Sequence, residues 1–146
     1  MTLAYRRFAH VGLWCICLAS VPLVANAYCE SHPTIKQETL ESRSIVVAKV
    51  LSERFIMDIP SDPEGVAATV YRLQVKRRLS GKIPKTVEVI SENTSGRFPM
   101  DVGSTYLLFV STSPAGLFID SCGHSDLISN SAETLRVIES QRRKRK

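Results

Sequence analysis

The chain has 146 residues, with 19 lysines and arginines against 14 aspartates and glutamates and a net charge of +5. Seven of the positive charges lie near its ends, in Arg6, Arg7 and residues 142–146, so the body between them has a net charge of −2. Such a body lacks the basic face of a nucleic-acid-binding domain, and we expect no nucleic acid among its partners.

An apolar segment near the N-terminus has the three regions of a secretory leader. Arg6 and Arg7 form a positive region, residues 11–25 are almost entirely apolar, and residues 25–27 (Ala-Asn-Ala) suit a signal peptidase. We therefore predict a signal peptide over residues 1–27 and a secreted or periplasmic mature protein. A retained membrane anchor is the alternative, although the apolar run is shorter than the roughly 20 residues of a membrane span.

Cleavage after residue 27 leaves 119 residues, which is enough for one domain with a hydrophobic core. A polar stretch at residues 36–43 can form a helical turn, and residues 132–139 have the spacing of an amphipathic helix. Turn-forming residues separate five segments that read as strands: residues 44–52 (extended by 55–57 past a bulge), 66–79, 86–90, 106–110 and 117–119.

Five strands and a terminal helix predict a mainly β protein. We expect a five-stranded Greek-key barrel of the OB-fold type with a short C-terminal helix, because closing the sheet into a barrel removes its exposed strand edges.

The four cysteines divide between the leader and the mature chain. Cys15 and Cys17 lie in the leader, whereas Cys29 and Cys122 lie near the two ends of the segment that remains. We expect the second pair to form a disulfide, because exported proteins fold in an oxidising compartment. Free or intermolecular thiols remain an alternative.

Each of the two histidines in the mature chain follows one of these cysteines. His32 lies three residues after Cys29, and His124 lies two residues after Cys122. If the cysteines meet as thiolates, the four side chains form a ligand set suited to tetrahedral zinc, which is the alternative to a disulfide. The expected disulfide leaves no metal site, and we predict no metal or other cofactor.

The sequence offers weak support for an enzyme. Serines and aspartates surround His124 at positions 120, 121, 125 and 126. Residues so close together at a strand end rarely converge as a catalytic triad, and no nucleophile-elbow or oxyanion motif accompanies them. We therefore expect a polar cap around the cysteines rather than a catalytic site, and we predict that the protein is not an enzyme.

The last five residues, 142–146, are all basic. Taken alone, such a tail can attract anionic lipid, glycan or nucleic acid. The simpler expectation is a solvated end that frays beyond the helix.

Several of these segments together have a recognisable pattern: the strand at 45–50, Gly81 before a Val-Glu-Val strand, Phe98 and Gly103 before Tyr106-Leu-Leu-Phe, and Cys122-Gly123. This pattern resembles the netrin-like domain, an OB-fold module shared with tissue inhibitors of metalloproteinases and with short bacterial exported proteins. The resemblance implies a netrin-like OB-fold domain at 28–130, followed by a helix and basic tail at 131–146.

The resemblance also implies a function: an exported, monomeric, non-enzymatic module that binds an extracytoplasmic protein, with metalloprotease inhibition as its most specific form. In the inhibitors, the free α-amine and carbonyl of an N-terminal cysteine chelate the target's zinc ion. Here Cys29 and His32 resemble that start, but Tyr28 precedes them and turns the amine into an amide. We predict Tyr28, Cys29, His32 and His124 as binding residues. The alternative is a metal-binding or hydrolytic protein built around Cys29, His32, Cys122 and His124.

Overall fold

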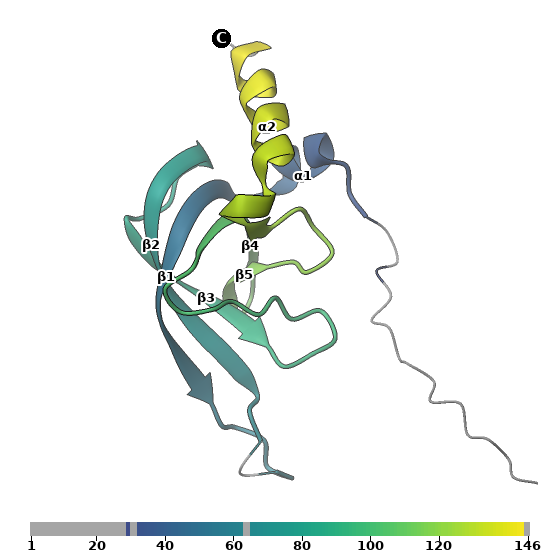
Figure 1. The fold of residues 1–146 in the computed structure, drawn as a ribbon. Coiled ribbons are helices and arrows are strands. Elements are labelled where there is room, and N and C mark those ends of the chain that lie inside the picture. The colour runs from purple at the N-terminus through teal and green to yellow at the C-terminus, as the bar shows by residue number, and fades with distance from the viewer. Residues whose placement is uncertain (1–28, 30–31, 63–64, 145–146) are drawn as a thin grey trace, which may run out of the picture.

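The computed structural model describes residues 29, 32–62 and 65–144 of the chain. The predicted leader, Tyr28 and the last two residues of the basic tail lie outside the described residues. The elements follow in chain order (Figure 1): α1 (Ile35–Glu41), β1 (Ser44–Ile56), β2 (Ala68–Gly81), β3 (Thr86–Glu92), β4 (Thr105–Ser113), β5 (Gly116–Ile119), β6 (Asp126–Leu127), the short 3₁₀ helix η1 (Ile128–Asn130) and α2 (Ala132–Lys144).

The strands form one antiparallel sheet in the order β3-β2-β1-β4-β5, and β6 pairs with β4. The sheet curls until its edge strands β3 and β5 lie against each other. The prediction of a mainly β, barrel-like fold with a C-terminal helix is confirmed, and all five predicted strands are present. The two-residue β6 was not predicted, because a pair of residues is too short to show alternation.

The first half of β1, up to Val50, and residues 106–110 of β4 are buried on both faces. Val46 and Ala48 face the barrel interior, whereas Ile45 and Val47 face outward into a second apolar cluster. In β4, the buried run at residues 106–110 divides between the same two clusters. A strand covered on both faces is apolar without interruption, which explains why these two segments do not alternate as the 66–79 segment does.

The second cluster lies beneath the two helices. Ile138 of α2 is fully buried in this cluster. Leu135, also of α2, and Ile35 of α1 pack against it. Helix α1 begins after Thr34, whose hydroxyl accepts a hydrogen bond from the Gln37 backbone N–H and so caps the first turn. The described part of the chain contains no helix with the length and hydrophobicity needed to cross a membrane.

Several elements end later than predicted. Helix α2 continues to Lys144 rather than ending at residue 139, and β2, predicted over residues 66–79, runs from Ala68 to Gly81. Gly81 ends that strand with a φ of +72°, and a Cβ at this position would collide with the Arg43 carbonyl oxygen. Gly81 therefore turns the chain at the last residue of the strand.

Two buried tyrosines hold the loop between β3 and β4. The Tyr71 hydroxyl accepts a hydrogen bond from the Met100 N–H at 3.2 Å, and the Tyr106 hydroxyl accepts one from the Asp101 N–H at 2.9 Å. Burial raises the pKa of Tyr106 above its ordinary value of 10.0. The phenol therefore stays neutral at physiological pH and remains available as a hydrogen-bonding anchor.

Candidate functional site

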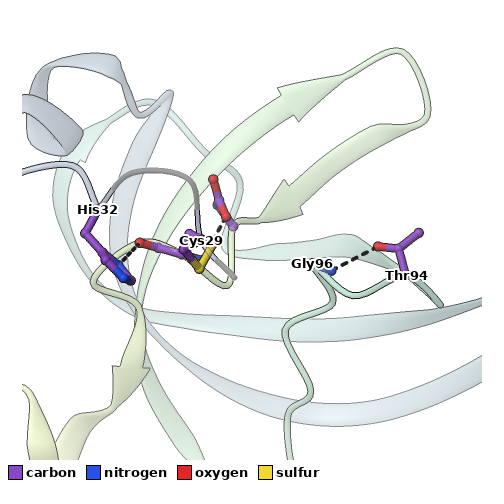
Figure 2. The surroundings of a disulfide bond; sticks show 6 residues. Cys29, His32, Thr94 and Gly96 are labelled. Atoms are coloured by element: carbon purple, nitrogen blue, oxygen red, sulfur yellow. Dashed lines mark hydrogen bonds between the residues drawn. A yellow bond between two sulfur atoms is a disulfide. The ribbon is translucent and has the colours of Figure 1, made fainter. Parts of the chain in front are cut away.

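The predicted disulfide is confirmed. Cys29 and Cys122 are bonded, with Cα atoms 5.7 Å apart and a sequence separation of 93 residues. Cys122 lies in the turn after β5, so the bond fixes Cys29, which precedes α1, to the end of the β4–β5 hairpin (Figure 2).

Two further contacts surround this bond. Nδ1 of the exposed His32 lies 3.3 Å from the Cys122 carbonyl oxygen, a distance at which a protonated Nδ1 donates a hydrogen bond (Figure 2). The Asp120 carboxylate accepts a hydrogen bond of 2.9 Å from the Cys122 N–H. Both backbone polar groups of Cys122 are thus engaged, which fixes the turn that carries the disulfide.

His124 belongs to a different contact, with Glu38 of α1. One carboxylate oxygen of Glu38 lies 2.7 Å from His124 Nδ1 and accepts the His124 backbone N–H at 2.9 Å. The Glu38 side chain is only 10 % exposed, whereas that of His124 is 30 % exposed. The pair therefore buries a carboxylate against α1 and satisfies it with two donors from the 120–125 loop.

Contacts with Phe109 of β4 also hold the 120–125 loop. The Ser125 hydroxyl accepts a hydrogen bond of 2.9 Å from the Phe109 N–H, and the Phe109 and His124 rings have centroids 6.3 Å apart. Gly123 lies directly against the Glu38 carboxylate, where a Cβ would collide with it. Disulfide, carboxylate and glycine together make this loop a fixed part of the surface.

The structure divides the four residues of the alternative metal site into two sets. Cys29, Cys122 and His32 come together, whereas His124 is bound to Glu38. The disulfide also consumes both thiolates that a zinc site would need. Among the described residues, no group of three or more His, Cys, Asp and Glu side chains could hold a metal ion.

A cleft of about 300 Å³ lies beside the disulfide turn. Its walls come from the end of β3, the loop at residues 93–97, the β4–β5 turn and the end of β5. Asp120, which binds the Cys122 N–H, lines the cleft, as do Thr94 and Gly96, and Figure 2 shows these last two in the surroundings of the disulfide.

Both apolar and polar residues line the cleft. Ile90, Ala115 and Phe118 supply apolar surface, while Glu92 and Asp120 supply carboxylates. On the loop, Arg97 Nη1 donates to the Asn93 side-chain oxygen at 3.2 Å, and the Gly96 N–H donates to the Thr94 hydroxyl at 3.3 Å. Such a lining suits a short apolar segment flanked by polar groups.

Sequence reasoning found part of this site and missed part. It identified Cys29, Cys122 and His32, but it placed no weight on Glu38, which lay in a segment read only as a polar helical turn. The available signal was spacing: Ile35, Glu38 and Thr39 occupy one face of a helix at i, i+3 and i+4. A carboxylate on the core-facing side of a helix indicates a buried partner.

Comparison with known proteins adds no relative. No model of a known protein family matches the chain, and no curated protein matches it significantly. The resemblance to the netrin-like domain stays a prediction.

Proposed function

We propose that this protein is an exported, non-enzymatic binding module of netrin-like type whose partner is an extracytoplasmic protein. Its binding surface is the disulfide edge, defined as residue 29, the loop at 93–97, the β4–β5 turn and the turn at 120–122. The observation that supports this proposal is the Cys29–Cys122 bond, which fixes the beginning of the mature chain next to the cleft.

Fixing the edge favours binding because association costs free energy for every segment that must be ordered. The N-terminal segment is tethered by the disulfide, and the turn that receives it is held by Asp120 and by the Glu38–His124 pair. The edge is therefore ordered before a partner arrives. The mixture of apolar and polar residues that lines the cleft is also compatible with a protein-binding surface.

A binding role also fits what the polar side chains around His124 already do. The His124 imidazole is paired with Glu38, and the Ser125 hydroxyl accepts a backbone N–H of β4. These interactions position the loop. Among the described residues, no hydrogen bond joins the His124 imidazole to a serine, threonine or cysteine, as a nucleophile activated by His124 would require.

Protease inhibition by zinc chelation is the most specific form of this proposal, and it depends on the residue at the mature N-terminus. A chain that begins at Cys29 presents a free α-amine at the disulfide edge. A chain that begins at Tyr28 has an amide nitrogen at the same place, which is not a zinc ligand. Binding in the cleft does not depend on this difference.

The binding proposal is tested by site-specific photocrosslinking of the mature, oxidised protein in an envelope or extracellular fraction. The crosslinker is placed at Thr94 or Ala115 on the disulfide edge and, as the control, at Arg72 on the β1–β2 hairpin. We expect one saturable adduct from the two edge positions, competed by unlabelled protein. With the crosslinker at Thr94, Ala115→Trp, which places a bulky side chain at the cleft, should reduce this adduct. Equal adducts from all three positions would contradict the proposal.

The inhibitory form is tested with two matched proteins, one beginning at Tyr28 and one at Cys29. Intact masses with and without reductant establish the N-terminus and, from a difference of two hydrogens, the disulfide. Inhibition of a zinc metalloprotease panel by the Cys29 form alone supports chelation. If neither form inhibits any protease, the chelating mechanism is excluded, and the crosslinking result decides the binding role independently.

A further inference from the structure

Basic side chains from two elements meet along α2. Arg77 Nη1 lies 3.3 Å from the Glu139 carboxylate, which places the end of β2 beside this helix. Arg136 and Arg143 lie one turn before and one turn after Glu139, on the same side of α2. Arg77, Arg136 and Arg143 are exposed.

The group extends along both elements. We define the basic end of the protein as Arg77 and Arg78 of β2 together with Arg136, Arg142, Arg143 and Lys144 of α2. The carboxylates of α2 are Glu133 in its first turn and Glu139, and Glu139 is bound to Arg77. In sequence, two more basic residues follow Lys144. Positive charge therefore predominates at this end of a body that is otherwise acidic.

The shape of the basic end indicates what kind of anion it fits. Figure 1 shows α2 standing out from one end of the barrel with the C-terminus at its tip, while the β1–β2 hairpin points the opposite way. Successive helix residues differ by about 100° around the axis, so Arg142, Arg143 and Lys144 face three directions. A linear polyanion contacts only one such row, whereas a plane of anionic groups approached end-on can engage all of them.

From this arrangement we infer that the basic end docks the protein on a membrane of anionic phospholipid. Each Lys or Arg near such a surface strengthens binding roughly fivefold, and the contributions combine into useful affinity without a shaped pocket. This goes beyond a basic tail, because Arg77 and Arg136 are held by the folded body. It is also independent of the disulfide edge, which includes no residue of β2 or α2.

The inference is tested by cosedimentation of the full mature, oxidised protein with phosphatidylcholine vesicles that contain either no phosphatidylglycerol or about one third of it. We expect binding to the anionic vesicles only, lost between about 0.1 M and 1 M salt as the Debye length falls from about 10 to 3 Å. The variant Arg77→Gln/Arg136→Gln, with residues 142–146 intact, should bind about threefold more weakly, because Arg136 lies about 12 Å from the tip of α2 and its charge is partly screened.

The matched control is Arg54→Gln/Arg72→Gln, which removes the same charge from the β1–β2 hairpin and should change binding less than about twofold. Because Arg77 contacts Glu139, a second variant, Arg143→Gln/Lys144→Gln, removes two charges at the tip of α2 that no described hydrogen bond or ion pair uses, and it should bind about 10- to 30-fold more weakly. Equal losses in test and control variants would overturn the inference. So would equal binding to neutral vesicles, or retention by sulfated polysaccharide or nucleic acid without binding to vesicles.

Discussion

Glu38 and His124, 86 residues apart, are joined by two hydrogen bonds to a single carboxylate oxygen, one of 2.7 Å from Nδ1 and one of 2.9 Å from the backbone N–H. This contact fixes α1 to the loop after β5. The disulfide between Cys29 and Cys122 joins the same two parts of the chain a few residues away. The N-terminal segment is therefore held by two tethers of different chemistry, only one of which is sensitive to reductant.

Replacing Glu38 should destabilise the protein more than replacing an exposed glutamate, although its sequence neighbours are mostly polar. Glu38→Ala leaves the His124 N–H and imidazole without their acceptor, and we expect a loss of about 2–4 kcal/mol in the free energy of unfolding. Glu38→Gln keeps one oxygen acceptor and should lose less. Urea denaturation of the oxidised proteins measures both.

Glu41 on the same helix provides the control. Its exposed carboxylate accepts only the Gln37 side-chain amide, at 3.0 Å. Glu41→Ala should change the stability by no more than about 0.5 kcal/mol. Equal losses for the two alanine variants would mean that the Glu38–His124 contact does not act as a tether.

Gly123 should not tolerate a side chain. An added Cβ would collide with the Glu38 carboxylate, which cannot move away without breaking its bonds to His124. We expect Gly123→Ala to cost about 1–3 kcal/mol. Gly96→Ala is the control, because the nearest atom to its Cβ would be the Thr94 hydroxyl oxygen at 3.8 Å. The measurement is the thermal midpoint of each variant. If Gly123→Ala and Gly96→Ala have the same thermal midpoint, the collision at residue 123 is relieved at no cost.

The strands were predictable because each one has a pattern that its surroundings require. The 66–79 segment alternates where β2 has one buried face, and the runs at 45–48 and 106–110 are apolar throughout where β1 and β4 lie between the barrel interior and the helices. The helix that covers them was predicted only to residue 139. Beyond that point α2 packs on little, and its polar residues show no apolar periodicity.

The site was less predictable, because it depends on partners far apart in the sequence. The Cys29–Cys122 pair could be predicted from the expected leader, because only two cysteines remain once residues 1–27 are set aside. The partner of His124 could not, because neighbours such as Asp120 are closer in sequence than Glu38, and only the packing of α1 brings Glu38 to the loop. The cleft arises from four separate segments and has no local signal.

The disulfide should account for a large part of the stability. It closes a loop of 93 residues, for which the restriction of the unfolded chain amounts to about 4–5 kcal/mol as an upper value. The double variant Cys29→Ser/Cys122→Ser should unfold at lower denaturant but keep its β-sheet circular dichroism, because the Glu38–His124 tether remains. The comparison of unfolding midpoints with and without reductant checks this.

Reductant should affect only the natural protein and leave the double variant unchanged. If the natural protein has the same midpoint with and without reductant, the bond contributes nothing to stability. The same pair of proteins also separates folding from binding. A folded double variant that crosslinks more weakly through Ala115 would show that the tether serves the disulfide edge.

Tyr106 should make stability fall at alkaline pH. Burial raises the pKa of its phenol above 10.0, so the folded state binds the phenolic proton more tightly than the unfolded state does. The stabilisation is fully present below pH 10 and declines as the pH rises through and beyond that value.

Tyr106→Phe should remove this component and, since the Asp101 N–H loses its acceptor, cost about 1 kcal/mol at neutral pH. Thermal midpoints of both proteins between neutral pH and pH 11 test this, because the lysines titrate alike in the two. The natural protein should lose its advantage over Tyr106→Phe as the pH rises, whereas parallel curves would mean that ionisation of Tyr106 is not coupled to unfolding.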